Sequence, residues 1–496
     1  MLYRTKLGQL TKGSKHQCRA SQTFTTKSRQ TSARFGLRCG YAFIALLVSL
    51  LVVACSQDSK TVFLTANNPP TDTTVLKIWW DKGFTVEEDE ALQQLVSNWE
   101  KQTGNKAKLS FYSTDELSQK VERELRTGDL PDLIAMFKSE KSLAARLAWE
   151  GKLADASDVI EPVKNLYPEA VLQTVNFYNK VEQKRSYYAL PIHQATIHVY
   201  YWRDLLEKVG RSESDIPKDW DAFWKFWKQI HNELRAKQKL DIYGLGLPLS
   251  IAAGDTYQTF EQILEAYDVQ ILDAQGQLRV DDPQVRQGIV KVLNWYAQSF
   301  RQGYLPPDAL HWLNPDNNRN LLNREVLMTT NDTLSIATAV RQDPDTYHKK
   351  LGILELPNKP SGKPMRYLIT VQQVILFADS KNQQTAKNFL AYLLEPEING
   401  NYLKVAGGRH SPVLKPVWKE RFWTDPNDPH VSTATKTFTE GRMRLFYTFQ
   451  NPAYSMVLKE NVWGKALKRV LVDGSSPEQA TDKATFAIKQ IFAQWQ

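Results

Sequence analysis

The sequence predicts an α/β protein of two or more domains that follows a leader segment. Strand-like and helix-like patterns alternate from residue 74 to residue 137, which indicates a parallel sheet covered by helices. About 420 residues follow residue 74, which is more than one typical domain contains. Hydrophobic residues make up 42% of the chain, enough to fill the cores of such domains.

The leader, residues 1–54, carries the whole net charge of the protein. It contains nine Lys or Arg residues and no Asp or Glu, whereas the full chain has 63 basic and 54 acidic residues and a net charge of +9. Subtracting these nine leaves 54 basic residues against 54 acidic ones. Overall basicity therefore gives no support for a nucleic-acid partner.

The apolar run from Tyr41 to Ala54 predicts a signal peptide. It has about 14 residues, fewer than the roughly 20 of a transmembrane helix, and it follows a cationic flank without acids. Val-Val-Ala-Cys at residues 52–55 resembles the bacterial lipobox, which implies cleavage before Cys55 and attachment of lipid to it. Cys18 and Cys39 lie in the leader, so the mature chain is expected to have neither a disulfide nor a cysteine-based metal site.

Residues 55–74 are expected to form a tether between the lipid and the folded body. They are mostly polar and include Pro69-Pro70, a composition typical of linkers. About 20 residues reach at most roughly 60 Å when fully extended.

Three short strands are predicted at the start of the folded body, at residues 74–80, 106–112 and 132–137, because each is rich in apolar, β-branched or aromatic residues. In a parallel sheet, ligands bind beyond the carboxyl ends of the strands. That rule predicts a binding edge made of Trp80, Asp81, Lys82, Ser113 and Phe137.

Two amphipathic helices are predicted between these strands. Residues 87–102 repeat apolar side chains at helical spacing, and Gly104 follows them. Thr114 is expected to cap the second helix, with Glu116 in its first turn and Gly128 after its end.

The later part of the chain is predicted to be largely helical. Helices are expected at residues 217–234 and 283–300, a strand at 243–247, and a final helix from a Ser-Ser-Pro start at residues 475–477 to about Trp495. Three tryptophans at helical spacing are expected to pack in a core, namely Trp220, Trp224 and Trp227.

Six segments occur in the order typical of one family and cover nearly the whole mature chain. They are LPDLIAMF (130–137), YYALPIHQATIHVYYWRDLLEKVG (187–210), DWDAFWKF (219–226), LLNREVLMTTNDTLS (321–335), ILFADSKNQQTAKNFLAYLLEPE (375–397) and GGRHSPV (407–413). In this order they resemble the extracellular solute-binding proteins of bacterial ABC importers, the group that includes maltose-binding protein. The chain departs from that pattern at Arg324-Glu325, where Gly-Lys is usual.

The resemblance implies the periplasmic-binding-protein fold, in which two discontinuous α/β lobes joined by hinge strands close over a solute. Lobe 1 is expected to comprise residues 75–196 and 372–418, and lobe 2 residues 197–371 and 419–496. The resemblance further implies a monomer without cofactor, anchored through Cys55 at the periplasmic side of the cell envelope. Such a protein would capture a small solute, most simply a carbohydrate, and deliver it to ABC permease subunits.

A sugar site needs flat apolar faces against the ring and polar groups for the hydroxyls. Some candidates come from strand ends and from the expected crossing between lobes, and others from the resemblance to family positions. Asp255 and Tyr257, for example, resemble a family loop after the strand at 243–247 that supplies an acid and an aromatic. Each has a structural alternative, such as packing, a solvated turn or a surface ion pair. The candidates are Trp80, Asp81, Lys82, Phe137, Gln194, Asp255, Tyr257, Asn331, Asp332, Arg409 and Tyr454.

Other ligands and functions remain open at this point. Lys82 and Arg409 could pair with a glycerol-phosphate type of ligand, and the acidic candidates could pair with a polyamine. A structural envelope lipoprotein is the alternative without transport. His193 and His198 are five residues apart, on opposite faces of a strand, which argues against a shared metal.

Enzyme signatures are missing from the sequence. It contains no GxxxxGK[ST], HExxH or GxSxG motif. A glycoside-processing enzyme needs only two carboxylates, so that alternative is not removed by motifs alone. The prediction is a binding protein without catalytic residues.

Overall fold

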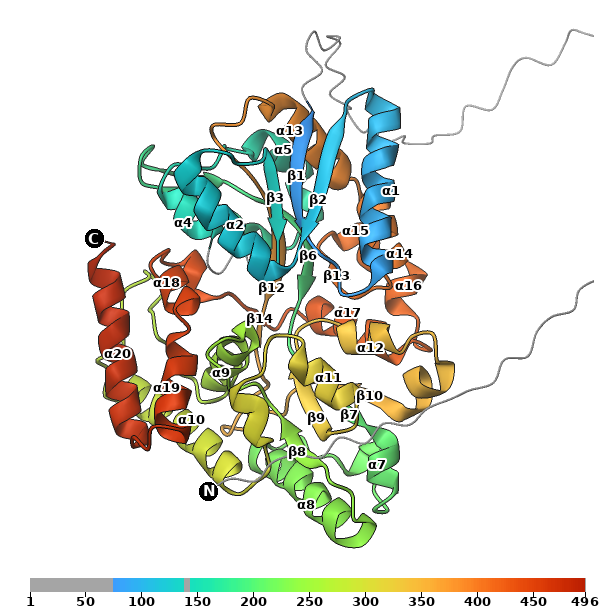
Figure 1. The fold of residues 1–496 in the computed structure, drawn as a ribbon, viewed down its shortest axis with the longest axis vertical. Helices are drawn as coiled ribbons and strands as arrows, with labels where there is room; N and C mark the ends of the chain where they lie inside the picture. Colours follow the sequence, from blue (N-terminus) through green and yellow to red (C-terminus); the bar gives the residue numbers. More distant parts are fainter. Residues whose placement is uncertain (1–74, 138–142, 496) are drawn as a thin grey trace, which may run out of the picture. The chain divides into compact units, whose positions relative to one another are not determined.

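A computed structural model describes residues 75–137 and 143–495. The predicted leader, Cys55 and the tether at residues 55–74 lie outside the described residues. In the described ranges, no helix is both long and apolar enough to cross a membrane. These ranges form two larger mixed β-sheets, two short two-stranded sheets and the helices that surround them (Figure 1).

The first sheet contains β1 (Leu76–Asp81), β2 (Ala107–Tyr112), β3 (Leu133–Met136), β6 (Leu190–Ala195), β12 (Thr370–Leu376) and β13 (Ser411–Pro412). Its strand order is β13-β6-β12-β3-β1-β2. β1 lies between β2 and β3 and is parallel to both, as the alternation of patterns predicted. β12 is antiparallel to β3 and β6, and β13 is antiparallel to β6, so the sheet is mixed. The expectation of a parallel sheet therefore holds only for β1, β2 and β3.

The second sheet contains β7 (His198–Trp202), β8 (Tyr243–Gly246), β9 (Val326–Asn331) and β10 (Leu351–Leu354). Its order is β10-β7-β9-β8, with β8 and β9 parallel and the other pairs antiparallel. The short sheets pair β4 (Asn176–Asn179) with β5 (Lys184–Tyr187), and β11 (Tyr367–Leu368) with β14 (Met443–Arg444).

The helices fall into two sets along the chain. Those in the segments that supply the first sheet are α1 (Val86–Thr103), α2 (Thr114–Thr127), α4 (Ala144–Trp149), α5 (Ser157–Ile160), α6 (Glu169–Gln173), α13 (Gln383–Leu393), α14 (Pro396–Val405) and α15 (Lys415–Trp418). The others are α7 (Arg203–Glu207), α8 (Trp220–Gln238), α9 (Gly254–Ala266), α10 (Pro283–Arg301), α11 (Asp316–Leu322), α12 (Ser335–Ala339), α16 (Arg421–Thr424), α17 (Pro429–Thr439), α18 (Tyr454–Lys459), α19 (Val462–Leu471) and α20 (Pro477–Ala493). In Figure 1, α1 runs beside β2 at one edge of the first sheet, and α19 lies alongside α20.

The start of α2 differs from the prediction by one residue. Ser113, not Thr114, is the cap: its hydroxyl accepts a hydrogen bond from the Glu116 backbone N–H, and the Glu116 carboxylate accepts one from the Ser113 N–H. This reciprocal box needs a hydroxyl residue three positions before a glutamate, a spacing that Ser113 satisfies. The prediction for α20 is confirmed, because the Ser476 hydroxyl accepts from the Gln479 N–H.

The tryptophan stripe of α8 is confirmed as core. Trp220, Trp224 and Trp227 are at most 3% exposed. The Trp224 ring meets Trp295 of α10 edge to face, with ring centroids 4.8 Å apart. The apolar periodicity of the two helices therefore predicted their packing correctly.

The chain passes between the two larger sheets at adjacent places. It leaves β6 and enters β7 through Thr196-Ile197, and Ile369 joins β11 to β12. The Thr196 hydroxyl donates to the Leu368 carbonyl at 2.9 Å, so the two crossings are hydrogen-bonded to each other. Gln262 of α9 accepts from the Leu368 N–H at 3.0 Å and holds the second crossing against that helix.

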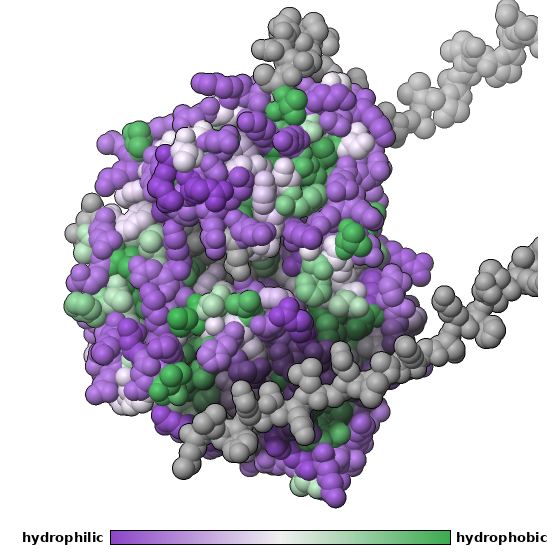
Figure 2. All heavy atoms as spheres, viewed as in Figure 1, coloured by the Kyte–Doolittle hydropathy of each residue, from purple (hydrophilic) through white to green (hydrophobic). Residues whose placement is uncertain are grey.

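The face of the molecule in Figure 2 is mostly hydrophilic, and its apolar side chains lie in small separate groups. Among the large apolar side chains exposed in the described ranges, Phe84 is 36% and Leu313 is 48% accessible. Single exposed apolar residues are common on protein surfaces. These two residues line the same cavity, as described next.

Candidate functional site

One cavity of about 370 Å³ is bordered by strand ends of both larger sheets, and we name it the main cavity. Its volume falls in the range of roughly 300–1,000 Å³ that is typical of small-molecule sites. The position agrees with the rule that ligands bind beyond the carboxyl ends of parallel strands. The lining residues are Lys82, Gly83, Phe84, Ser113, Thr114, Phe137, Asp255, Leu313, Asn314, Pro315, Asn318, Asn331, Asp332, Thr333, Ser335 and Arg409.

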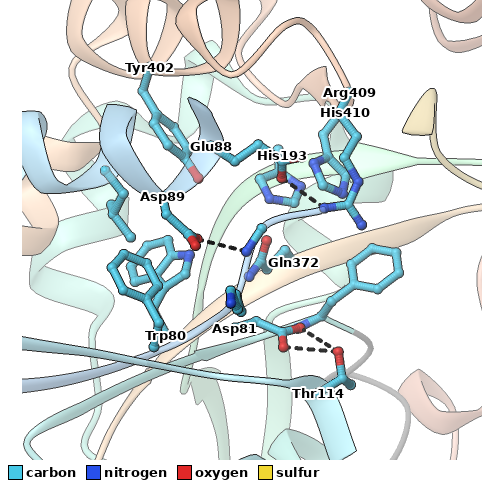
Figure 3. A pocket seen from close by; sticks show the side chains of 15 residues that line it. Trp80, Asp81, Glu88, Asp89, Thr114, His193, Gln372, Tyr402, Arg409 and His410 are labelled. Carbon is cyan, nitrogen blue, oxygen red and sulfur yellow. Dashed lines mark hydrogen bonds and ion pairs between the residues drawn. The ribbon is translucent and has the colours of Figure 1, made fainter. Parts of the chain in front are cut away.

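A side cavity of about 50 Å³ shares Lys82, Gly83, Thr114, Phe137 and Arg409 with the main cavity. Since one water needs roughly 10–15 Å³ measured in this way, the side cavity holds a few waters and not a sugar ring. Its other walls include Trp80, Asp81, Glu88, Asp89, His193, Gln372, Tyr402 and His410 (Figure 3).

The loop between β1 and α1 is held by acidic side chains at the start of α1. The Gly83 N–H donates to Asp89 Oδ1 at 2.7 Å, and the N–H groups of Phe84 and Thr85 donate to Glu88 Oε1 at 3.2 and 3.3 Å. A Cβ on Gly83 would lie 2.6 Å from the Glu88 Cβ and 2.9 Å from the Thr85 carbonyl oxygen. Only glycine fits there without a shift of the loop.

Arg409 connects a distant part of the chain to this loop. Its guanidinium donates to Glu88 Oε2 at 2.7 Å and lies 5.6 Å from the centroid of the Phe84 ring. The Arg409 carbonyl accepts from the Leu334 N–H at 2.8 Å, next to the end of β9. Arg409 therefore touches elements that belong to both larger sheets.

Asp81 is the last residue of β1, one residue beyond the strand predicted at residues 74–80. Its carboxylate accepts from the Thr114 hydroxyl at 2.9 and 3.1 Å and from the Phe137 N–H at 2.9 Å. It thereby joins the ends of three neighbouring strands. Trp80 is 3% exposed and lines the side cavity, not the main one.

Two buried histidines form the far wall of the side cavity. The rings of His193 and His410 stack with centroids 3.8 Å apart (Figure 3). Burial, followed by the charge of Arg409, lowers the pKa of His193 to about 3, although a hydrogen bond with Gln372 opposes the shift. Burial and the neighbouring His193 and Arg409 lower the pKa of His410 well below its usual range. Both imidazoles are therefore neutral at neutral pH.

On the side of the second sheet, a network of uncharged polar groups lies next to Asp332 in the wall of the main cavity. The Asn331 amide, at the end of β9, donates to the Thr333 carbonyl at 2.8 Å and to the Ser335 hydroxyl at 2.9 Å. The Asn318 amide donates to the same Ser335 hydroxyl at 2.9 Å. The Asn318 Oδ1 atom is buried and has no hydrogen-bond partner among the described residues.

Asp255 lies in the first turn of α9 and lines the main cavity, whereas the resemblance had implied a loop at this position. Its backbone N–H donates to the Asn314 side chain at 3.2 Å. The helical assignment corrects the expected local structure of Asp255 and Tyr257. Asp332 follows directly after β9 and also lines the main cavity.

The structure brings most, but not all, of the predicted residues together. Lys82, Phe137, Asp255, Asn331, Asp332 and Arg409 line the main cavity, and Trp80 and Asp81 line the side cavity. Three other candidates line neither cavity, and all three are buried: Gln194, Tyr257 and Tyr454. A role of any of these residues in binding a solute stays a prediction.

The buried candidates have structural partners. The Gln194 amide donates to the Pro412 carbonyl at 2.8 Å, where β6 meets β13. The Tyr454 hydroxyl donates to Glu261 Oε1 at 2.7 Å, and burial together with that carboxylate raises the pKa of Tyr454 well above its usual value.

Several lining residues were not among the candidates. Phe84 lies a few residues after the end of the first predicted strand, and its ring is exposed. An aromatic residue so close to a strand end is a sequence signal that could have made it a candidate. Ser113 was part of the predicted binding edge but not of the final candidate set, and Thr114 was assigned only to helix capping. Asn314 and Asn318 have no such local signal, because α11 reaches the cavity only through tertiary packing.

The donor set of the cavity fits an organic solute better than a metal. No group of three or more His, Cys, Asp or Glu side chains in residues 75–137 and 143–495 has the arrangement of a metal site. Amide, hydroxyl and guanidinium groups converge there together with apolar faces. Such a combination can orient a polar molecule without bond chemistry.

Comparisons with known proteins agree with this geometry. The chain is 22% identical over 462 residues to a galactooligosaccharide-binding protein of Bacillus subtilis, which covers 91% of this chain and 96% of that protein. A solute-binding protein from Thermotoga lettingae bound to α-D-tagatose has a TM-score of 0.70 at 20% identity, and the match covers 84% of this chain and 99% of that one. UgpB from Mycobacterium tuberculosis, in complex with glycerophosphocholine, has a TM-score of 0.67 at 16% identity, with coverage of 86% and 100%. These structural likenesses establish the two-lobed α/β fold of periplasmic binding proteins.

A family model described as bacterial extracellular solute-binding protein matches residues 85–400. The match spans well over half of the chain and includes β2 to β12. Proteins of this family bind solutes, which is consistent with a cavity between two sheets. The chain belongs to the bacterial extracellular solute-binding protein family.

Proposed function

We propose that this protein captures a carbohydrate in the main cavity by closure of two lobes and delivers it to the permease of an ABC importer. The names of its relatives support the choice of ligand, since they include a galactooligosaccharide-binding protein and a tagatose-bound protein. The step is binding and release, without bond chemistry. A monomer suffices for this role.

The observation that carries the proposal is the composition of the main cavity. Phe84, Phe137, Leu313 and Pro315 supply apolar faces, against which the C–H face of a sugar ring can pack. Amides and hydroxyls on the side of the second sheet supply hydrogen-bond groups for the sugar hydroxyls. Phe84 and Phe137 belong to the first proposed lobe, whereas Leu313, Pro315 and these amides and hydroxyls belong to the second, so a solute held between them favours closure.

The proposed lobes are residues 75–196 with 372–418 and residues 197–371 with 419–496. The distribution of strands supports this division, because the second sheet uses only residues 198–354. The first sheet uses residues 76–195, 370–376 and 411–412, so β12 begins two residues before the proposed boundary. The crossings at Thr196 and Ile369 would be the hinge.

The proposed location is the periplasmic side of the cell envelope, with a lipid anchor on Cys55 and residues 55–74 as tether. This part of the proposal rests on the leader sequence and on the extracellular character of the family. Metabolic labelling with a radioactive fatty acid tests it: the wild-type chain should incorporate label, and Cys55→Ser should not. Label in the variant would contradict anchoring at Cys55.

A thermal-shift screen of the full chain in mild detergent tests the ligand. A solute at 100 times its Kd should add about 2.7 kcal/mol of stability, so a sugar panel should contain compounds that clearly raise Tm. Polyamines and phosphate esters serve as the competing classes. If only a protein or envelope partner raises Tm, the transport proposal fails and the structural alternative stands.

Titration calorimetry with the best sugar then tests the site. Phe84→Ala should weaken binding about tenfold, because the variant loses an aromatic face worth about 1–1.5 kcal/mol. Phe486→Ala is the matched control, since that ring is 63% exposed on α20 and lines neither cavity. Equal affinities of the two variants would place the sugar elsewhere.

A glycerophosphate type of ligand is the second candidate, because Lys82 and Arg409 both line the main cavity. UgpB of similar fold binds glycerophosphocholine according to its description. The pairing of Arg409 with Glu88 weighs against this candidate, since it compensates one of the two cations. The phosphate esters in the screen decide between the two.

A further inference from the structure

Both carboxylate oxygens of Glu88 accept hydrogen bonds from other parts of the site. Glu88 is 7% exposed, and it is the third residue of α1. Oε1 accepts from the backbone N–H groups of Phe84 and Thr85, and Oε2 accepts from the Arg409 guanidinium at 2.7 Å. The Glu88 carboxylate therefore holds the loop after β1. It also holds the Arg409 guanidinium, which carries a positive charge into the lining of the main cavity.

The pairing changes what a solute meets in the main cavity. The charged lining residues are Lys82 and Arg409 on the positive side and Asp255 and Asp332 on the negative side. Because Glu88 compensates Arg409, the guanidinium offers hydrogen bonds without a full net charge. Lys82 is exposed, so water and salt screen its charge.

The surroundings of this pair add no positive charge. His193 and His410 pack beside Arg409 in the side cavity and are neutral at neutral pH (Figure 3). The groups on the opposite side of the main cavity are amides and hydroxyls, including Asn331 and Ser335, together with the acidic residues Asp255 and Asp332. An anionic solute would thus find little compensating charge.

We propose that Glu88 is a positioning residue that sets the charge selectivity of the main cavity. By pairing with Arg409 it makes the cavity favour uncharged polyhydroxylated solutes over their phosphate esters. This inference rests on the proposed function, because it assumes that the solute lies in the main cavity. It goes beyond that function by naming the residue that excludes the phosphorylated class.

Glu88→Gln isolates the charge from the geometry. The amide oxygen can still accept from the Phe84 and Thr85 N–H groups, as Oε1 does now. The amide NH₂ would face the Arg409 guanidinium, and since both are donors the pair is lost. The positive charge of Arg409 then becomes available to a ligand.

Asp89→Asn is the matched control. Asp89 is the next residue of the same helix, it braces the same loop through the Gly83 N–H, and it too lines the side cavity. No described contact joins it to Arg409. Both substitutions remove one negative charge from the start of α1, so a general loss of charge or of loop order affects both.

The experiment measures the affinity of the full chain for matched pairs of neutral and phosphorylated compounds. The probes are glucose with glucose 6-phosphate, glycerol with glycerol 3-phosphate, and inorganic phosphate alone. The ratio of ester affinity to neutral affinity should rise about tenfold in Glu88→Gln, as expected for removal of a unit charge within roughly 8 Å in a partly screened site. The rise should shrink at 0.5 M salt and be absent in Asp89→Asn.

Inorganic phosphate makes the test independent of the sugar. It should bind Glu88→Gln about tenfold more tightly than the wild type, whichever carbohydrate the protein takes. An unchanged ratio with unchanged phosphate binding in a folded Glu88→Gln would overturn the inference, as would an equal change in Asp89→Asn. Failure of every neutral sugar to bind the wild type would instead overturn the proposed function.

A reciprocal variant covers the case in which Glu88→Gln does not fold. Arg409→Gln leaves the Glu88 charge at the cavity without its partner, so phosphate binding should fall further and spermidine binding should rise by several fold. Unchanged binding of both ions in Arg409→Gln would contradict the role of the pair. Circular dichroism of each variant verifies the fold before titration.

Discussion

On the side of the first sheet, the wall of the main cavity is held by ionised groups, whereas on the side of the second sheet it is held by amides and hydroxyls. Asp81, Glu88 and Asp89 accept from backbone N–H groups and from Thr114 and Arg409. Asn331, Thr333 and Ser335 bond instead among themselves and to Asn318. The two walls are therefore held by different chemistry.

The difference explains why acidic residues near the site do not by themselves indicate a cationic ligand. A hydrogen bond to a charged group contributes about 1.5–3 kcal/mol and a neutral one about 0.5–1.5 kcal/mol, so a few carboxylates can order one loop. The second wall needs several weaker bonds for the same effect. We expect the first wall to respond to pH and salt and the second to respond only to loss of its own groups.

The largest effect is expected for Gly83→Ala in the first wall. The new Cβ would overlap the Glu88 Cβ and the Thr85 carbonyl, so the loop must move at a cost of about 3 kcal/mol. Urea unfolding measures the stability, and calorimetry should detect at least tenfold weaker sugar binding. In the control, Gly254→Ala at the start of α9, the Cβ would meet only ordinary contacts at 3.5 Å or more, and little should change. Equal behaviour of the two variants would contradict the tight loop.

A smaller loss is expected for Asn331→Ala in the second wall. Removing the amide deletes its two hydrogen bonds, to the Thr333 carbonyl and to the Ser335 hydroxyl, while Tyr200 and Asn318 still donate to these two acceptors. Two neutral hydrogen bonds are worth about 2 kcal/mol together. This loss should be the same at pH 5 and pH 8 and at low and high salt. Asn323→Ala, at an exposed amide, is the control and should be near neutral. A strong salt dependence would contradict a network held by uncharged groups.

Acid should weaken the first wall through its histidines. The folded pKa of His193 is about 3, below its ordinary value of 6.5, so between these values the unfolded state binds more protons. Stability should thus be fully present above pH 6.5 and fall as the pH drops below it, by about 1 kcal/mol per pH unit for one such group. His193→Phe should flatten this slope in urea titrations at several pH values, and His311→Phe, at an exposed site, should not. A steeper slope in His193→Phe would contradict the assignment.

The smallest effect is expected outside the cavity, at an ion pair between the proposed lobes. Lys459 of α18 donates to Glu122 of α2 at 2.7 Å, and both side chains are partly exposed. Such pairs contribute about 0.2–1 kcal/mol, so Lys459→Met should weaken sugar binding by less than about fivefold. The difference should vanish at 0.5 M salt. A larger effect that persists at high salt would mean that the pair is not a simple surface contact.

The sequence predicted the strand ends of the site because hydrophobic runs stop visibly. Lys82, Phe137 and Asn331 follow or end such runs, and all three line the main cavity. Local chemistry also predicted α1, α2, α8, α10 and α20, although α8 begins at Trp220 and not at residue 217, and the cap of α2 is Ser113 and not Thr114. These features depend on residues close in sequence.

Contacts between distant segments could not be predicted from one sequence. Glu88 and Arg409 are 321 residues apart, and Tyr454 meets Glu261 across 193 residues. Nothing in the residues around Tyr454 distinguishes a tyrosine that stacks on a ligand from one that bonds a buried carboxylate. Family position alone favoured the ligand, and the structure gives the hydroxyl a protein partner.

Arg324 illustrates a departure from family pattern whose reason is visible only in three dimensions. It has a φ of 64°, a left-handed conformation that favours glycine, which is the usual residue of the family here. Its guanidinium lies 4.1 Å from the centroid of the Trp202 ring and pairs with Asp204 at 2.9 Å. These contacts offset a backbone cost of about 1 kcal/mol.

The hydrogen bond between Thr196 and Leu368 has a mechanical consequence. Two strands that cross between rigid bodies at separate points would allow twisting and shearing as well as bending. Because these crossings are bonded side by side, independent rotation about either one would break the bond. For the proposed lobes, this bond therefore favours bending about the two crossings together over independent twisting of either one.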